Sequence, residues 1–131
     1  MPPAMKSLLS LFTAPERRQL WRYLFTVLLA VISWLALSAA PPKTFSTGWD
    51  KSNHALAFAA LAFSAVWGWW QQPRQWPRLI AVLVAYGIGI EIAQSFLPPR
   101  EADWHDVVAD SIGIALGLLA AWPVTWLTRT K

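Results

Sequence analysis

Three ionisable residues stand inside or at the edge of apolar sequence, where an uncompensated charge is costly. Glu91 and Asp110 each lie within an apolar run, and His54 opens another. A charged side chain at the centre of a membrane helix costs about 2.5–3.5 kcal/mol, so residues of this kind usually mark functional sites. Carboxylates and imidazole can accept hydrogen bonds, transfer protons or bind a divalent cation. These residues are therefore the first candidates for chemistry.

The spacing of the polar residues predicts that they share helix faces in pairs. Residues three or four apart are neighbours on a helix surface. The pairs are Asp50 with His54, Glu91 with Gln94, and Asp106 with Asp110. Small residues four apart predict a ridge on which helix backbones approach closely in a membrane. That ridge is Ala109, Gly113, Gly117 and Ala121.

The composition indicates a membrane protein. The 131 residues are 56% hydrophobic and only 14% charged, against about 25% charged in a soluble domain, and mean hydropathy is +0.37. The net charge is +4, but the basic residues stand at the ends of apolar runs, which is a membrane pattern and argues against nucleic acid. The absence of cysteine excludes disulfide and thiolate chemistry.

Four apolar runs predict an all-α fold, a polytopic bundle of four transmembrane helices in one domain. About 20 helical residues cross a hydrocarbon core about 30 Å thick. The segment before the runs, residues 1–19, is expected to lie along the inner interface or to form a disordered tail. Residues 128–131 form a cytoplasmic tail. The transmembrane domain is residues 20–127, with spans at 20–40, 54–70, 77–97 and 107–127.

The first run has an alternative interpretation as a cleaved signal peptide. "RRQLWRY", an apolar stretch and "LSAA" have the order of such a peptide. The apolar stretch is longer than the usual 7–15 residues. We therefore expect a retained span.

The lysines and arginines predict the orientation. With the N-terminus in the cytoplasm, eight of them lie inside and three outside, as the positive-inside rule requires. Both termini are then cytoplasmic, and the ends of three helices deliver polar side chains to the outer face. We expect a ligand-binding pocket there, formed by Asp50, Lys51, His54, Glu91, Gln94, Arg100, Asp106 and Asp110.

This ordered set resembles the VanZ-like family of small bacterial integral membrane proteins. The matching pieces are "DKSNHALAF", "EIAQSFLPPR" and "DVVADSIGIALG", in family order between residues 50 and 117. Asp110 departs from the family pattern, which usually has asparagine, and Asp103 stands near a position often occupied by serine. The resemblance implies a multi-pass protein of the bacterial cytoplasmic (inner) membrane and cell envelope. It also implies a link to resistance against the glycopeptide teicoplanin, but no mechanism.

Three functions fit these residues. The favoured one is a non-enzymatic envelope protein that binds a lipid-linked or peptidoglycan-related ligand, with Lys51 and Arg100 holding phosphate or carboxylate groups. The second is a membrane hydrolase or transferase using acid–base or metal chemistry, although HExxH, nucleophile-elbow and phosphate-loop motifs are absent from the sequence. The third is a buried ion network that fixes helix register.

The expected partners follow from the favoured function. We expect membrane lipids and a lipid-linked envelope precursor, and no nucleic acid. Whether the chain is a homo-oligomer stays open. The sequence favours no cofactor and no metal, and it leans against an enzyme.

Overall fold

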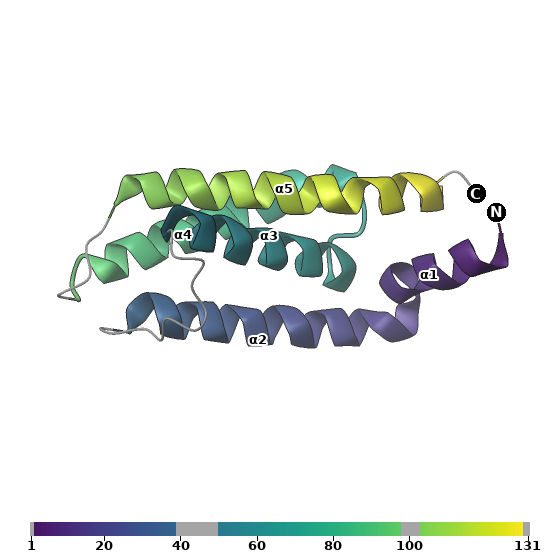
Figure 1. Cartoon of the computed structure of the whole chain (residues 1–131), viewed down its shortest axis with the longest axis horizontal. Helices are drawn as coiled ribbons and strands as arrows, with labels where there is room; N and C mark the ends of the chain where they lie inside the picture. The colour runs from purple at the N-terminus through teal and green to yellow at the C-terminus, as the bar shows by residue number, and fades with distance from the viewer. Residues whose placement is uncertain (1, 39–49, 98–102, 130–131) are drawn as a thin grey trace.

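The computed structural model describes residues 2–38, 50–97 and 103–129, with positions 50 and 129 described for the backbone alone (Figure 1). Every regular element in these ranges is helical. Two short 3-10 helices, Pro15–Arg17 and Pro73–Gln75, precede the second and fourth α-helices. The α-helices are α1 (Pro3–Thr13), α2 (Arg18–Leu37), α3 (Asp50–Gly68), α4 (Trp76–Gln94) and α5 (Trp104–Arg129).

Two α-helices, α1 and α4, and both 3-10 helices have a proline as their first or second residue. Pro3, Pro15, Pro73 and Pro77 each occupy the first turn of a helix. Proline suits that position because its fixed φ is already helical and its missing N–H would have no partner inside the helix. The breakers "QQPRQWPR" therefore separate α3 from α4, as the sequence predicts.

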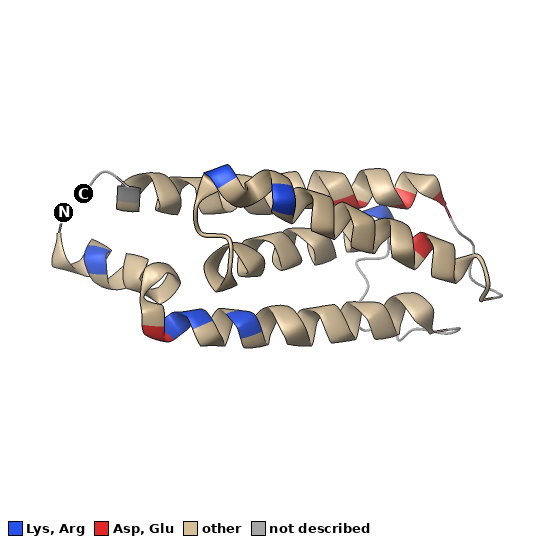
Figure 2. Cartoon of the chain, turned by 180° about the vertical axis from the view of Figure 1, so that it is seen from behind, with Lys and Arg blue, Asp and Glu red and all other residues tan. Residues whose placement is uncertain are grey.

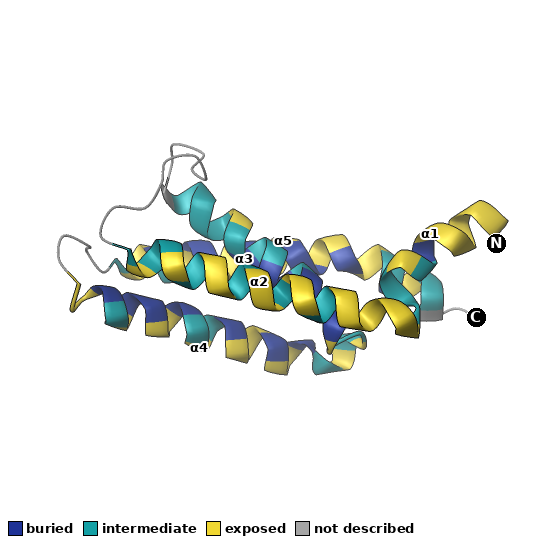
Figure 3. Ribbon diagram, turned by 90° about the horizontal axis from the view of Figure 1, so that it is seen from below, coloured by how far each residue is buried: buried dark blue, intermediate teal, exposed yellow. Residues whose placement is uncertain are grey.

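Helix α3 lies at the centre of the bundle. It packs most extensively against α5 and then against α2, while α4 packs mainly against α5. Phe58, Leu61, Val66 and Trp67 of α3 are almost completely buried. The outer faces of α2 and α4 carry many exposed apolar residues (Figure 3). An apolar outer surface is what a bundle surrounded by lipid requires.

Three segments are long and apolar enough to cross a membrane. They are Pro15–Leu37, Pro73–Gln94 and Trp104–Thr128. Helix α3 is not among them, because its first five residues, "DKSNH", lower its hydropathy. Because every regular element of the described residues is helical, the predicted all-α fold class is confirmed, with three candidate membrane spans. The fourth predicted span, 54–70, falls on α3 and stays a prediction.

Two helices begin about one turn before the predicted spans. Helix α3 begins at Asp50, before the predicted residue 54, and α5 begins at Trp104, before residue 107. The two starts are joined by the contacts of Lys51 with Asp103 and Asp106. The N-terminal segment, predicted to be either interfacial or disordered, forms α1, where Phe12 stacks on Trp21 at 5.7 Å.

Candidate functional site

The polar site lies at the end of the bundle opposite the two termini. This end is formed by the end of α4 and the beginnings of α3 and α5 (Figure 1). Most acidic residues gather there, whereas most lysines and arginines lie toward the terminal end (Figure 2). The sequence predicted this convergence, which positions the side chains described below.

Close packing of α3 against α5 brings the two polar helix starts together. Ala109, Gly113, Gly117 and Ala121 are all buried. A Cβ atom placed on Gly113 would overlap the carbonyl oxygen of Ala55 in α3. The small residues therefore let the two backbones touch, and the side chains one turn farther out meet across the seam.

Lys51 joins the starts of α3 and α5. Its Nζ lies 2.9 Å from Oδ2 of Asp103 and also contacts Oδ1 of Asp106. Asp103 caps α5 as well, because its Oδ1 accepts a hydrogen bond from the backbone N–H of His105 at 2.9 Å. Lys51 first, and then the hydrogen bonds from His105, hold the pKa of Asp103 well below its ordinary value.

His54 lies between two aspartates of α5. Its Nδ1 is 2.9 Å from Oδ1 of Asp110, and its Nε2 is 3.5 Å from Oδ2 of Asp106. The side chains of Asp106 and Asp110 are only 6% and 2% exposed. Gly87 of α4 makes room for Asp110, since a Cβ there would come within 2.6 Å of Oδ2. The imidazole is thus oriented by Asp110 through Nδ1, and its Nε2 faces Asp106.

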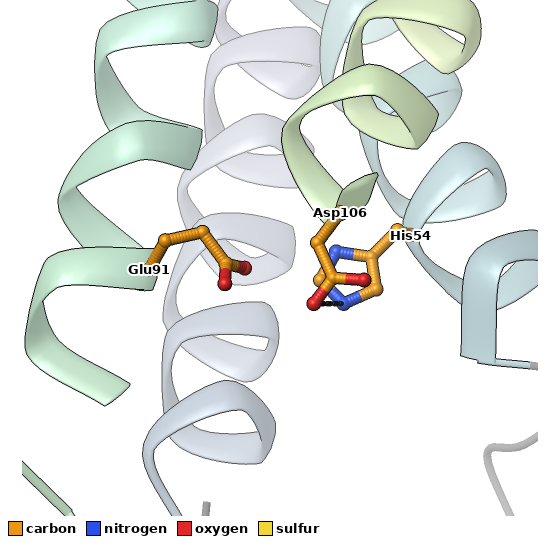
Figure 4. Close-up of side chains that lie close together, drawn as sticks. All are labelled: His54, Glu91 and Asp106. Atoms are coloured by element: carbon orange, nitrogen blue, oxygen red, sulfur yellow. Dashed lines mark ion pairs between the residues drawn. The ribbon is translucent and has the colours of Figure 1, made fainter. Parts of the chain in front are cut away.

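Glu91 completes the cluster from α4. It is 7% exposed, and its Oε2 accepts a hydrogen bond from the backbone N–H of Asp103 at 2.8 Å. Its Oε1 is buried and has no hydrogen-bond partner among the described residues. His54, Glu91 and Asp106 point toward one another, with one potential ligand atom from each within 4.8 Å of the others (Figure 4). Two carboxylates this close repel each other unless a proton or a cation lies nearby.

An apolar groove lies beside this cluster. It has a volume of about 530 Å³ and runs between the end of α4 and the start of α5. Glu91 contributes to its wall, so the groove and the polar cluster share this side chain. The apolar lining consists of Ile88, Ile92, Trp104, Val107 and Val108.

The structure brings five of the predicted pocket residues together and places one elsewhere. The five are Lys51, His54, Glu91, Asp106 and Asp110. Gln94 instead turns toward α2, where its Nε2 donates a hydrogen bond to the carbonyl oxygen of Ala36 at 2.8 Å. Arg100 and the side chain of Asp50 lie outside the described residues.

Asp103 is a site residue that sequence reasoning left out of the pocket. Its position before an apolar run indicated a helix cap, and it does cap α5. The same carboxylate binds Lys51 from a different helix, and its backbone N–H binds Glu91. The "DWHD" spacing, with Asp103 and Asp106 three apart, was the available signal, but a cap alone explained it equally well.

Comparison with known proteins gives the family. The model of the VanZ/LLP1 family matches residues 6–127, which is nearly the whole chain. This chain belongs to the VanZ/LLP1 family. The VanZ-like resemblance of the sequence is thereby confirmed, and family membership together with the three apolar segments identifies a membrane protein.

A relative of this VanZ/LLP1 protein occurs in a fungus. "Uncharacterized protein C11E3.10" of Schizosaccharomyces pombe is 33% identical over 98 residues, which cover 73% of this chain. The aligned part is 59% of the fission yeast protein, so the chain spans about three fifths of that relative. No solved structure matches the chain.

Proposed function

We propose that this VanZ/LLP1 protein is a non-enzymatic protein of the bacterial inner membrane that binds a lipid-linked or peptidoglycan-related envelope molecule. The polar head of the ligand lies against the cluster of His54, Glu91 and Asp106, and its apolar chain lies in the groove between α4 and α5. The observation that carries this proposal is the double position of Glu91, which belongs to both the polar cluster and the groove wall.

The groove suits the apolar part of such a ligand. Ile88 and Ile92 are 44% and 58% exposed, so the groove opens on the outer surface of the bundle. In a membrane this surface faces acyl chains, and a lipid-linked molecule can enter sideways without leaving the bilayer. Apolar walls with a few convergent polar groups are typical of ligand sites.

The charges of the cluster favour hydroxyl and amine groups in the polar head. Among the described residues, the carboxylates of Glu91, Asp103, Asp106 and Asp110 lie near one lysine, Lys51, and two histidines, His54 and His105. Lys51 is already held by two of the aspartates. Carboxylates accept hydrogen bonds from sugar hydroxyls and amines, whereas a phosphate would be repelled unless a cation accompanied it.

The site faces the outside of the cell in this proposal, and α3 is the fourth span. The charge distribution supports this orientation, because basic residues at cytoplasmic loops orient membrane helices. Six basic residues lie in α1, in the two 3-10 helices and in the first two turns of α2 and α4: Lys6, Arg17, Arg18, Arg22, Arg74 and Arg78.

Filling the groove tests the proposal. Ile88→Trp places a large ring in the groove, and Val82→Trp places the same ring on an exposed face of α4 outside it. We expect native mass spectrometry of protein extracted with its own lipids to show a bound amphiphile in the wild type and in Val82→Trp, and about tenfold less in Ile88→Trp. Equal occupancy in all three proteins, or none in the wild type, would show the proposal to be wrong.

The polar half of the site is tested with Glu91→Gln, and Glu16→Gln at the opposite end is the matched control. The same pair tests the link to teicoplanin, by growth of bacteria that express each variant in the presence of the drug. We expect Glu91→Gln alone to lose both the bound amphiphile and any protection that the wild type gives.

A membrane hydrolase or transferase is the second candidate, because of the pair formed by Asp110 and His54. An imidazole oriented by a buried aspartate is a suitable general base. Turnover of lipid-linked phosphates by the wild type, lost in His54→Gln while amphiphile binding remains, would favour this enzyme over a binding protein.

A further inference from the structure

We propose that His54, Glu91 and Asp106 form a binding site for one divalent transition-metal ion, of the Zn²⁺ or Mn²⁺ kind, with Asp110 as the residue that orients the imidazole. The sequence alone favoured no metal. The inference rests on the geometry of these side chains, which are the same ones that the polar head of the proposed amphiphile contacts, and its test measures binding of the metal alone.

Each of the three side chains has one polar atom fixed by the protein. Oδ1 of Asp106 contacts Lys51, and Nδ1 of His54 is 2.9 Å from Asp110. Oε2 of Glu91 accepts the N–H of Asp103 at 2.8 Å. These contacts orient the side chains so that their remaining polar atoms converge (Figure 4).

The spacing suits a small ion. Neighbouring ligand atoms around tetrahedral Zn²⁺ are about 3.4 Å apart, from bond lengths of about 2.0–2.2 Å. Nε2 of His54 and Oδ2 of Asp106 are 3.5 Å apart. One potential ligand atom of Glu91 lies within 4.8 Å of the potential ligand atoms of both partners.

The unsatisfied oxygen of Glu91 is an independent indication of a ligand. Oε1 is buried without a hydrogen-bond partner among the described residues, in a side chain that is 7% exposed and aimed at His54 and Asp106. A buried carboxylate oxygen without a partner is costly. A divalent cation would satisfy it and would also balance the charges of the two carboxylates.

The type of metal follows from the ligands. Imidazole favours Zn²⁺ and its transition-metal neighbours, whereas Ca²⁺ and Mg²⁺ prefer oxygen ligands alone. A metal-binding histidine usually donates its other ring N–H to a carboxylate, as the contact from His54 to Asp110 allows. Three protein ligands leave a fourth position for water or for a polar group of another molecule.

The test is metal binding by the full chain in lipid nanodiscs after treatment with a chelator. We expect calorimetric titration and elemental analysis to give one Zn²⁺ or Mn²⁺ per chain, and at least about 100-fold weaker binding of Ca²⁺ and Mg²⁺. His54→Gln and Glu91→Gln should abolish stoichiometric binding, and Asp110→Asn should weaken it about 10–100-fold. His105→Gln, an exposed histidine at the same end, is the matched control and should bind like the wild type.

Size-exclusion chromatography and helix content show whether each variant is folded. If a ligand variant does not fold, X-ray absorption spectroscopy of the metal-loaded wild type identifies the atoms that bind the ion. The proposed site requires one imidazole nitrogen and carboxylate oxygens around it. The proposal is overturned by a wild type that takes up no stoichiometric Zn²⁺ or Mn²⁺, by a metal shell without imidazole, or by a folded Glu91→Gln that binds as tightly as the wild type.

Discussion

At the scale of single residues, the partner of each carboxylate distinguishes its role. Asp110 is deeply buried and holds His54, whereas Asp103 has a side chain that is 42% exposed and holds Lys51. Glu91 and Asp103 both line the apolar groove, but of these three carboxylates only Glu91 keeps one buried oxygen without a partner among the described residues. The same functional group, a carboxylate, therefore orients His54, caps helix α5, or is available as a potential metal ligand.

The contact between Asp103 and Lys51 predicts a dependence of stability on pH. The pKa of Asp103 is lowered in the folded chain, mainly by Lys51. The contact therefore stabilises the fold fully above the unfolded pKa of about 3.9, and this stabilisation is lost progressively as the pH falls from there toward the lower folded pKa. We expect Asp103→Asn to lower the melting temperature at pH 7, by an amount that begins to shrink below about pH 4. Melting curves in the presence of a chelator measure this.

Glu16→Gln provides the control for that experiment, since it also removes one negative charge but lies at the other end of the bundle. A difference between wild type and Asp103→Asn that stays constant down to pH 3 would contradict the role given to the charged pair.

At the scale of elements, the seam between α3 and α5 positions the site. Gly113 lies against the backbone of Ala55, the residue that follows His54, and is one turn from Asp110 on its own helix. Helix α2 is attached from the other side through the hydrogen bond from Gln94 to Ala36 and through one from Arg22 to Gly68. The polar cluster thus depends on a backbone contact that tolerates no side chain.

The substitution Gly113→Ala, which adds one methyl group, tests whether the seam between α3 and α5 positions the site. Gly113→Ala would overlap the carbonyl oxygen of Ala55 and push α3 away from α5, at a cost of about 1–3 kcal/mol in the free energy of unfolding. Gly89→Ala is the matched control, because a Cβ there meets nothing within 4 Å. We expect Gly113→Ala to lower thermal stability in detergent and to weaken metal binding, while Gly89→Ala leaves the binding unchanged. Equal behaviour of the two variants would mean that the seam does not position the site.

At the scale of the whole molecule, the chain has one acidic and one basic end. The helix ends near the termini carry most lysines and arginines, and the opposite end carries the carboxylate cluster (Figure 2). An apolar bundle of this kind has two possible orientations in a membrane, and the basic end decides between them. The proposed orientation places the polar cluster where extracytoplasmic ligands can reach it.

Cysteine labelling tests the orientation. The sequence contains no cysteine, so each variant has a single site for the label. Phe96, which is 77% exposed at the acidic end, and Ser7 of the exposed α1 surface are suitable positions. We expect a membrane-impermeant maleimide to label Phe96→Cys on intact cells, and Ser7→Cys only after permeabilisation. Labelling of Ser7→Cys on intact cells would reverse the proposed orientation.

The sequence by itself determined the helical class, the membrane character and the end of the bundle at which the polar residues meet. These properties depend on composition, on apolar run length and on positions along single helices, which are local quantities. For the same reason the sequence identified Lys51, His54, Glu91, Asp106 and Asp110 as neighbours at one depth.

Only the tertiary structure decided which of these side chains touch and through which atoms. Contacts between helices depend on the rotation of each helix about its axis, and that rotation is set by non-local packing such as Gly113 against Ala55. It turns Gln94 toward α2, brings Asp103 to Lys51, and leaves one buried oxygen of Glu91 without a hydrogen-bond partner among the described residues. Residue spacing along one helix contains no information about these rotations, because each depends on the surfaces of the other helices.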